Sequence, residues 1–387
     1  MKIGARNILH VLPSLREAFG GPLRLVLDLS ARAESPTFKS QILGVGRLEV
    51  KDNPVAPSTV HSVPAGRTGS YAYSGELRPW LRCNLTDFDG VVVHGAWTYS
   101  GWAAATECRS AGIPYAYYPH GMLDYWSVYG QGIVKAAKKQ AYWIFRERQV
   151  ANHARCTLFT TVREQEGTEK AFPIASTKRI LRPYGLEVPP PPALEPENPA
   201  LLQRPDSRVA LFLGRLHPKK NIELLIQAWR DAGMVAPWRL LIAGSGEADY
   251  EAHLKRMVDD LGQSAAIQFS GFVSGIDKRY LLGRAEWFLL SSRQENFGIA
   301  VLEAIAQGCA VAISEQVYLA ESFPPDSEVL PVSVKAWTEF FQTRMRNREW
   351  RDHVWRNDRD HLLKQFRMDL IVNQWKETFL DLFPKQR

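Results

Sequence analysis

The sequence predicts an α/β protein with two doubly wound, Rossmann-like domains. Short apolar runs alternate with amphipathic helical patterns along most of the chain, and one proline-rich stretch interrupts this alternation near its middle. Continuous apolar strands separated by helices are typical of a parallel sheet that helices cover on both faces. A length of 387 residues is sufficient for two such domains.

In the first half, five apolar runs predict strands, and amphipathic patterns lie between several of them. The strands are expected at "NILHVL" (7–12), "SQILGV" (40–45), "GVVVH" (90–94), "IPYAYYP" (113–119) and "CTLFTT" (156–161). The helices are expected at 21–33, 101–111 and 132–152.

The clearest linker is "EVPPPPALEPENPALLQRPDS", residues 187–207, whose seven prolines oppose regular structure. The alternation then restarts as a second βα array. Its strands are expected at 208–214, 239–244, 266–271, 287–292 and 310–314, and its helices at 221–232, 250–261, 277–285 and 296–307.

These patterns divide the chain into an N-terminal domain over 1–186, the linker over 187–207, a C-terminal domain over 208–365 and a last helix over 366–387. Aromatic residues are frequent in the helical stretch 335–383, where core positions are expected. Ligands of doubly wound sheets bind at the carboxyl ends of the strands, so two such domains facing each other would form a cleft.

Charge and composition narrow the classes of partner. The net charge of +7 suits nucleic acid, an anionic membrane or a phosphorylated ligand, but neither a zinc-finger spacing nor an RNP-type strand is present. The four scattered cysteines argue against zinc and disulfides and are compatible with a reducing cytoplasm. Neither a signal peptide nor an 18-residue apolar run is recognised, so a cytoplasmic protein without a transmembrane helix is expected.

Two glutamates stand eight positions apart in "SSRQENFGIAVLEAIAQG", residues 291–308. Asn296 is predicted to cap a helix that runs to about Gln307, which would leave the amides of Phe297 and Gly298 as donors for a phosphate. Glu295 and Glu303 could accept hydrogen bonds from sugar hydroxyls at two points of one elongated ligand. By themselves, the two acids are a weak signal, since the first is also compatible with a capping residue and the second with a surface residue of a core-packed helix.

Other strand ends of the second half carry groups that suit a nucleotide. Arg215, Lys219 and Lys220 follow one strand and could bind a diphosphate. The glycines of Gly244-Ser245-Gly246 would let the backbone approach a ligand closely, and Gly271 with Phe272 could face a nucleobase. Each group alone is also compatible with an ordinary surface loop.

Taken in order, "GRLHPKKN", "GSG", "FSGFV" and "SSRQENFGIAVLEAIAQG" resemble glycosyltransferase family 4 over nearly all of residues 208–315. The resemblance implies a retaining enzyme of the GT-B architecture, with two Rossmann-like domains facing across a cleft. The first domain would be the acceptor side, the second the nucleotide-sugar side, and the last helix would cross back to the first. Glu295 and Glu303 match the E-x₇-E motif of the family.

The first half agrees with this resemblance. "FGGP" (19–22), with Gly20 and Gly21, is similar to the glycine-rich loop that approaches the donor phosphate, and "YYPHGMLD" (117–124) is similar to the P-H-G segment of exopolysaccharide and O-antigen enzymes. The family then implies that His120 reaches the donor sugar near the reacting carbon. His94 and Trp97, in "VVVHGAW", are expected on the acceptor side. The alternative for each is a structural residue after a strand.

Two departures from the family pattern leave the charged groups in place. Ser291 stands where the family often has proline, and Gly308-Cys309-Ala310-Val311 replaces the usual G-x-P-V, so the choice of donor stays open. The strings Asp87-Phe88-Asp89 and Asp358-Arg359-Asp360 do not end strands. They are interpreted as chance spacings, so no catalytic metal and no cofactor is expected. Arg215, Lys220 and helix amides would replace the metal.

The expected activity is transfer of a hexose from a GDP- or UDP-linked donor, itself a substrate, to a hydroxyl of a glycan or lipid-linked oligosaccharide in surface polysaccharide synthesis. Catalytic roles are assigned to His120, Glu295, Arg215 and Lys220. Donor binding is assigned to Gly20, Gly21, Gly244, Ser245, Gly271, Phe272, Asn296, Phe297, Gly298 and Glu303. The alternatives are a catalytically inactive nucleotide-sugar-binding partner and another GT-B enzyme such as a sugar-nucleotide epimerase.

The stretch 132–154 combines basic residues with Trp143, Ile144 and Phe145. It is either a Rossmann-type helix with a basic solvent face or a contact with the anionic inner face of the plasma membrane.

Overall fold

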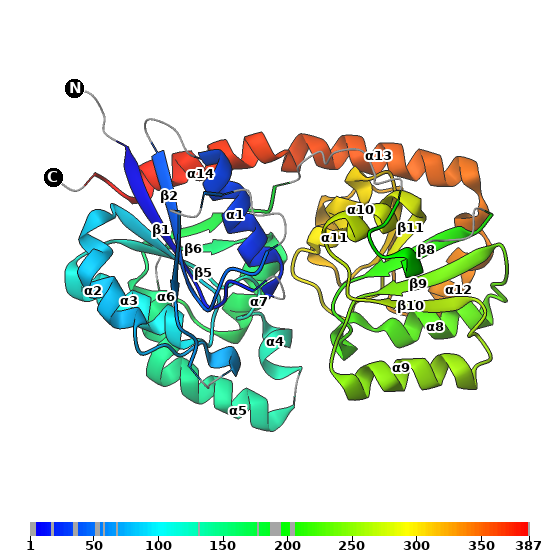
Figure 1. Ribbon diagram of the computed structural model, residues 1–387, viewed down its shortest axis with the longest axis horizontal. Coiled ribbons are helices and arrows are strands. Elements are labelled where there is room, and N and C mark those ends of the chain that lie inside the picture. Colours follow the sequence, from blue (N-terminus) through cyan, green and yellow to red (C-terminus); the bar gives the residue numbers. More distant parts are fainter. Residues whose placement is uncertain are drawn as a thin grey trace. The chain divides into compact units, whose positions relative to one another are not determined.

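The structure of the protein, a computed structural model, describes residues 5–16, 19–33, 38–50, 55–56, 59–66, 69–130, 132–175, 178–185, 195–201 and 206–385. The chain separates into two compact units (Figure 1). Unit 1 comprises Met1–Gly185 and Met368–Arg387, and unit 2 comprises Leu186–Arg367. Both units are α/β, which confirms the predicted fold class.

Unit 1 is built on a seven-stranded sheet in the order β3-β2-β1-β4-β5-β6-β7, in which all pairs are parallel. Its strands are β1 Arg6–Leu12, β2 Phe38–Val45, β3 Val60–Val63, β4 Gly90–His94, β5 Tyr115–Tyr118, β6 Cys156–Phe159 and β7 Lys178–Leu181. Its helices are α1 Gly21–Ala33, α2 Leu77–Asn84, α3 Tyr99–Ala111, α4 Tyr125–Tyr129, α5 Ile133–Tyr142, α6 Arg148–His153, α7 Val162–Ala171 and α14 Met368–Leu382.

Strand alternation divides the core of unit 1 between the two faces of its sheet. Leu9 of β1 and Val91 of β4 pack with residues of α2 and α3 in one cluster. Leu12 and Ile42 pack with α1 in another. His10 has the opposite alternation to Leu9, and its ring meets Phe379 of α14 at 5.9 Å between centroids. The last helix therefore packs on the sheet of unit 1 (Figure 1).

Unit 2 has a six-stranded parallel sheet in the order β10-β9-β8-β11-β12-β13. Its strands are β8 Arg208–Leu213, β9 Trp238–Ala243, β10 Ile267–Gly271, β11 Ala285–Leu290, β12 Ala310–Ser314 and β13 Glu328–Leu330. Its helices are α8 Ile222–Asp231, α9 Ala248–Asp260, α10 Gly275–Arg284, α11 Ile299–Ala306, α12 Val334–Gln342 and α13 Arg348–Phe366.

Three strands were not predicted, and all three are short. β3, β7 and β13 have three or four residues each. The side chains of β7 are exposed or half-buried, so the strand has no apolar run to reveal it. Parallel pairing with β6 makes it a strand, and that information is not local.

Two helix predictions also need correction. The expected helix 132–152 is interrupted by a π-helical segment, Trp143–Glu147, between α5 and α6. Helix α11 begins at Ile299, three residues later than expected, because Gly298 adopts φ +77° and forms the N-cap. Asn296 is therefore not the cap, and among the described residues its Oδ1 has no hydrogen-bond partner.

Most of the predicted linker, residues 187–194 and 202–205, lies outside the described residues. Within the described part of the chain, none of the helices has the length and apolarity required to cross a membrane.

Candidate functional site

The strand order of unit 2 reverses between β8 and β11, which are neighbours in the sheet. In a doubly wound sheet, the loops that leave such a pair of strands separate and leave room for a ligand. The loop after β8 carries Arg215, Lys219 and Lys220, and the loop after β11 carries Glu295. The predicted catalytic groups of the second half thus meet at the topological switch point of their sheet.

Glu295 and Lys220 form an ion pair with side chains 16% and 19% exposed. Burial alone would raise the pKa of Glu295. The charges of Lys220, Lys219 and Arg215, with a hydrogen bond from Lys220, outweigh that effect and lower the pKa. Glu295 is therefore an anion held by a cluster of cations.

The backbone of Glu295 is fixed by the loop that follows β12. Its amide donates to the carbonyl of Gln316 at 3.0 Å, and its carbonyl accepts from the amide of Tyr318 at 2.9 Å. The loop after β8, which carries the cations, is bound to the end of β11, since the hydroxyl of Ser291 donates to the carbonyl of Asn221 at 2.9 Å. The ion pair thus joins two loops whose main-chain atoms are each held by hydrogen bonds.

Glu303 lies on α11 and pairs with Lys278 of α10, with 2.7 Å between Nζ and Oε1. The two side chains are about one third exposed. Lys278 was not predicted, and no motif in the sequence marks it. A lysine in the first half of a helix is unremarkable until the fold brings it to Glu303.

The start of α11 differs from the predicted phosphate site in its details. Gly298 and the first residues of the helix are half-buried, so amides at this helix start remain near the surface. The side chain of Phe297 is only 2% exposed and packs edge-on against Phe366 of α13, at 5.6 Å between centroids. Phe297 therefore anchors the loop, and any ligand contact it makes must come from its backbone.

The glycines after β9 allow the loop that follows β9 to pack closely against the loop that follows β8. A Cβ on Gly244 would lie 1.8 Å from the carbonyl oxygen of Gly214, and one on Gly246 would lie 2.0 Å from that of Leu216. The amide of Leu216 donates to the carbonyl of Ser245 at 2.9 Å. The close approach predicted for a ligand is thus made by the backbone after β8, while Ser245 stays exposed.

Gly271 ends β10 with φ +74°, and Phe272 beside it is 59% exposed. An exposed aromatic ring at a strand end remains compatible with stacking on a nucleobase. In unit 1, Gly20 is exposed with φ +77° and directly precedes α1, which starts at Gly21. The glycine loop therefore opens a helix, as its sequence indicates.

The strand order of unit 1 reverses between β1 and β4. His120 follows β5, the next strand in the sheet, and lies in left-handed conformation at φ +53° with 8% exposure. A histidine in this conformation is unusual and has to be held by its surroundings. Buried Glu164 contributes by accepting from the amide of Gly121 at 2.5 Å and from that of Thr160 at 2.7 Å.

His94 and Trp97, which are expected on the acceptor side, have little exposed surface. His94 is fully buried, with its ring nitrogens 2.9 Å from nitrogens of His10 and His120. Trp97 is half-buried, and its indole N–H donates to the carbonyl of Met122 at 2.9 Å. Strand alternation explains the burial of His94, since its side chain points toward the same face of the sheet as His10.

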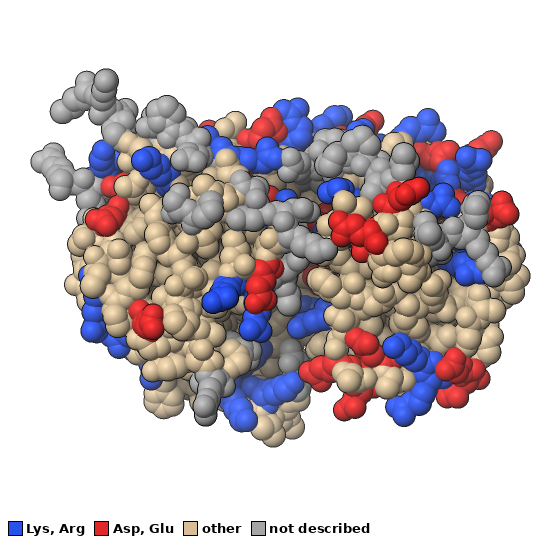
Figure 2. Space-filling model, viewed as in Figure 1, with Lys and Arg blue, Asp and Glu red and all other residues tan. Residues whose placement is uncertain are grey.

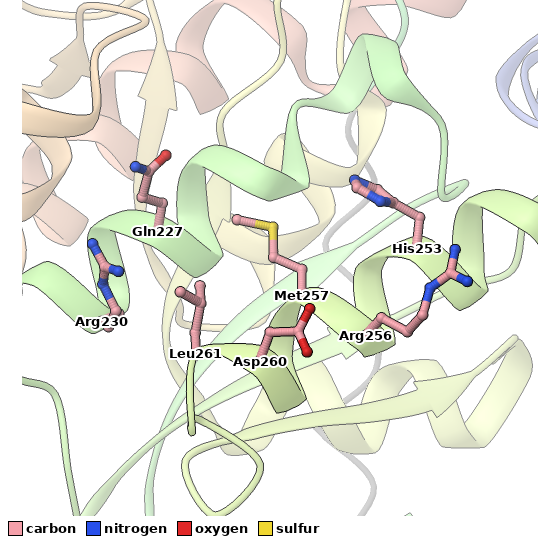
Figure 3. A pocket seen from close by; sticks show the side chains of 7 residues that line it. All are labelled: Gln227, Arg230, His253, Arg256, Met257, Asp260 and Leu261. Carbon is pink, nitrogen blue, oxygen red and sulfur yellow. The ribbon is translucent and has the colours of Figure 1, made fainter.

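In each of the two D-x-D strings, one aspartate accepts a hydrogen bond from another part of its own unit. Asp89 accepts from the amide of Asn7 at 2.9 Å, and buried Asp358 accepts from the hydroxyl of Ser327 at 2.5 Å. A cavity of about 400 Å³ opens between α8 and α9 and is lined by Arg230, His253 and other side chains (Figure 3). None of the predicted site residues lines this cavity.

Family models match both units. Residues 20–185 match the glycosyl transferase 4-like domain, and residues 195–335 match the glycosyl transferases group 1 domain. The chain belongs to the glycosyltransferases. This confirms the resemblance drawn from the motifs, and the two parallel sheets are those of the GT-B architecture.

Individual relatives support the same placement. This glycosyltransferase is 25% identical over 318 residues to GDP-mannose:cellobiosyl-diphosphopolyprenol alpha-mannosyltransferase of Xanthomonas oryzae pv. oryzae, which covers 80% of this chain and 78% of the relative. It is 38% identical to the uncharacterized glycosyltransferase MJ1607 of Methanocaldococcus jannaschii over 109 residues, 28% of this chain. The chain spans only 27% and 26% of the length of the first two curated relatives it matches.

Among solved structures, the chain is similar to Anabaena Alr3699/HepE in complex with UDP and glucose. The TM-score is 0.76 at 17% sequence identity, over 97% of this glycosyltransferase and 100% of the other chain. At this identity the likeness establishes the fold alone.

Proposed function

We propose that this glycosyltransferase is a retaining, metal-independent enzyme that moves a hexose from a nucleoside-diphosphate sugar to a hydroxyl of a glycan or lipid-linked oligosaccharide during surface polysaccharide synthesis. One observation carries the proposal. At the switch point of unit 2, an anionic carboxylate and a cluster of cations stand together at the ends of β8 and β11. A sugar diphosphate presents hydroxyls and negative charge, which are the complementary groups.

We assign each group a part of the donor. Glu295 accepts from hydroxyls of the transferred sugar, while Arg215, Lys220 and the amides at the start of α11 bind the diphosphate. Lys220 and Glu295 can remain paired, because an ammonium has three hydrogens and a carboxylate about four lone-pair sites. Glu303 accepts from the ribose, and Phe272 stacks on the base.

In the proposed reaction, the bond between the anomeric carbon and the diphosphate oxygen breaks, and a bond to the acceptor oxygen forms on the same face. The acceptor proton passes to the leaving phosphate. The diphosphate gains charge in the transition state, and preorganised cations that stabilise such charge are usually the largest catalytic contribution. His120 of unit 1, which is buried and hydrogen-bonded, acts beside the transferred sugar.

The nucleoside of the donor is either guanosine or uridine. The Xanthomonas relative is named for GDP-mannose, and the Anabaena structure contains UDP. The two candidates differ in the base, which the region around Gly271 and Phe272 would have to distinguish.

Thermal unfolding with added GDP, UDP, ADP and dTDP tests the donor site. A nucleotide at about 100 times its Kd adds about 2.7 kcal/mol of stability. We expect one nucleotide to raise the Tm of the wild type and to have less effect on Arg215→Ala. Arg230→Ala, on α8 beside the separate cavity, is the matched control and keeps the full effect. If none of the four raises the Tm at millimolar concentration, the donor site is wrongly assigned.

We also propose that unit 1 contacts an anionic membrane, where a lipid-linked acceptor would lie. Ile133, Val134, Ile144 and Phe145 are 89%, 70%, 60% and 72% exposed. They accompany Lys135, Lys138 and Arg148, which are also exposed. Figure 2 shows basic and no acidic side chains over α5 on the face in view. Exposed apolar residues among cations are typical of helices that bind the surface of anionic bilayers.

Sedimentation with lipid vesicles tests this contact. We expect binding to vesicles that contain phosphatidylglycerol and weak binding to pure phosphatidylcholine, with loss of binding in the double variant Ile144→Ser, Phe145→Ser. Val235→Ser removes a side chain of similar exposure, 68%, from unit 2 and serves as the control. Equal binding of the double variant and the wild type would contradict the proposal.

A further inference from the structure

Three histidines and one tyrosine of unit 1 form a continuous chain of hydrogen bonds. The hydroxyl of Tyr184 lies 2.9 Å from Nδ1 of His120, and Nε2 of His120 lies 2.9 Å from Nδ1 of His94. Nε2 of His94 lies 2.9 Å from Nδ1 of His10. His10 lies in β1, His94 ends β4 and His120 follows β5, so the chain crosses the switch point of the sheet.

All four side chains are buried. His10 and His94 are 0% exposed, Tyr184 is 5% exposed and His120 is 8% exposed. The ring of His120 stacks on His94, at 5.2 Å between centroids, and on Tyr118, at 3.9 Å. Burial lowers the pKa of His10 and of His120 to about 3, and the pKa of His94 lies well below its usual value for the same reason. The three rings are therefore neutral at neutral pH.

A neutral imidazole carries one hydrogen, on either Nδ1 or Nε2. Each link of this chain joins an Nδ1 to an Nε2 and needs one hydrogen. If His10 carries its hydrogen on Nδ1, His94 has to accept at Nε2 and therefore carries its own on Nδ1, and His120 follows. If His10 carries its hydrogen on Nε2, the same argument places all three on Nε2. A mixed chain would contain a link with two hydrogens or with none.

We propose that His10 and His94 are positioning residues, which fix the tautomer and orientation of His120 through this chain. His10 is two links away from His120 and determines the state of its ring without touching it. The far end of the chain is closed, because Nε2 of His10 has no hydrogen-bond partner among the described residues and its ring faces Phe379 of α14.

The inference deepens the proposed function, because His120 is the residue of unit 1 that we place beside the transferred sugar. Its first test does not depend on activity. We would record ring ¹⁵N and ¹H correlations of protein labelled in histidine, which report the tautomer of each ring. We expect one tautomer at His10, His94 and His120 alike, and a change in the ring ¹⁵N shifts of His120 in His10→Phe.

Three variants separate positioning from folding. His10→Phe keeps an aromatic ring but breaks the link to His94. His10→Asn has an amide near the position of Nδ1, which can restore the link in either direction. His61→Phe is the control, since His61 is a partly buried histidine of β3 that bonds to Gln41 outside the chain.

The second readout is release of nucleoside diphosphate from the donor. We expect kcat to fall about tenfold in His10→Phe, the ratio that corresponds to 1.4 kcal/mol, with the donor KM within about twofold and partial recovery in His10→Asn. The inference would be overturned if the three rings had different tautomers, or if the ring ¹⁵N shifts of His120 were unchanged in His10→Phe. If the three tautomers agree but the wild type releases no nucleoside diphosphate from any donor, the proposed function is wrong, while the inference about the hydrogen-bonded histidines is retained.

Discussion

The Nζ of Lys220 and the Oε2 of Glu295 form an ion pair across the switch point of unit 2. These residues are 75 positions apart in sequence. The carboxyl ends of β8 and β11 bring them together, and Lys219 and Arg215 add positive charge around the carboxylate.

Glu295→Gln should separate sugar recognition from nucleotide recognition. If Glu295 binds the transferred sugar, removing its charge leaves the affinity for the nucleoside diphosphate unchanged or slightly stronger, since an anion near the phosphates is lost. The affinity for the intact donor should fall about tenfold, because a hydrogen bond to a charged group contributes about 1.5–3 kcal/mol. Isothermal titration with both ligands measures the two constants, and a parallel loss for both would reject the assignment.

Glu303→Ala should lower the affinity for the nucleoside diphosphate and for the intact donor by the same factor, about tenfold, because both ligands contain the ribose. The comparison with Glu295→Gln is the control, since only one of the two variants should discriminate between the ligands. Lys278→Met tests the neighbour of Glu303, and a double-mutant cycle between the two gives their coupling. An unchanged nucleotide affinity in Glu303→Ala would remove this residue from the site.

The ion pair of Glu295 should make the difference in unfolding free energy between the wild type and Glu295→Gln depend on pH. The pKa of Glu295 is lowered in the folded state, so its contribution is complete above the usual value of 4.5 and is lost as the pH falls through the lowered pKa. Urea unfolding of the wild type and Glu295→Gln between pH 3 and 8 measures the gap. We expect a constant gap at and above about pH 5 and a smaller one below pH 4. A gap that grows on acidification would contradict the pairing.

Glu147 should show the opposite dependence. It is buried in the π-helical segment, and burial raises its pKa to about 7, although Tyr117 and the amide of Trp97 donate to it. Its ionisation therefore destabilises the folded state as the pH rises from about 4.5 to 7. Relative to Glu147→Gln, the wild type should lose up to about 3 kcal/mol over that range and nothing further above it. Thermal unfolding at several pH values checks the sign.

Gly244→Ala should destabilise unit 2 by at least about 3 kcal/mol, because the added Cβ would lie 1.8 Å from the carbonyl oxygen of Gly214. Gly271→Ala is the matched control. It also has a positive φ, but no atom lies within 4 Å of its added Cβ. It should lose only about 1–2 kcal/mol, the cost of a left-handed alanine. Denaturant unfolding compares them, and equal losses would mean that loop contact is not the reason for Gly244.

Local patterns were sufficient to predict most elements of both sheets. Apolar runs such as 208–214 and 310–314 reflect burial on both faces, and the residues after them lie at strand ends wherever the strands lie in the sheet. The position of Glu295 after a buried strand and of Lys220 before a helix could therefore be predicted. The short strands β3, β7 and β13 could not, because each has only three or four residues, and β7 in addition has no buried side chain.

The sequence by itself determined the two α/β units, their strand ends and the residue types available there, because periodicity and turn chemistry are local. Only the tertiary structure decided which of these residues meet. Strand order places Lys220 beside Glu295 and Lys278 beside Glu303, and alternation on adjacent strands turns His94 inward between His10 and His120. Hydrogen bonds and ion pairs extend only about 3–4 Å, so their partners depend on the packing of segments that are distant in the chain.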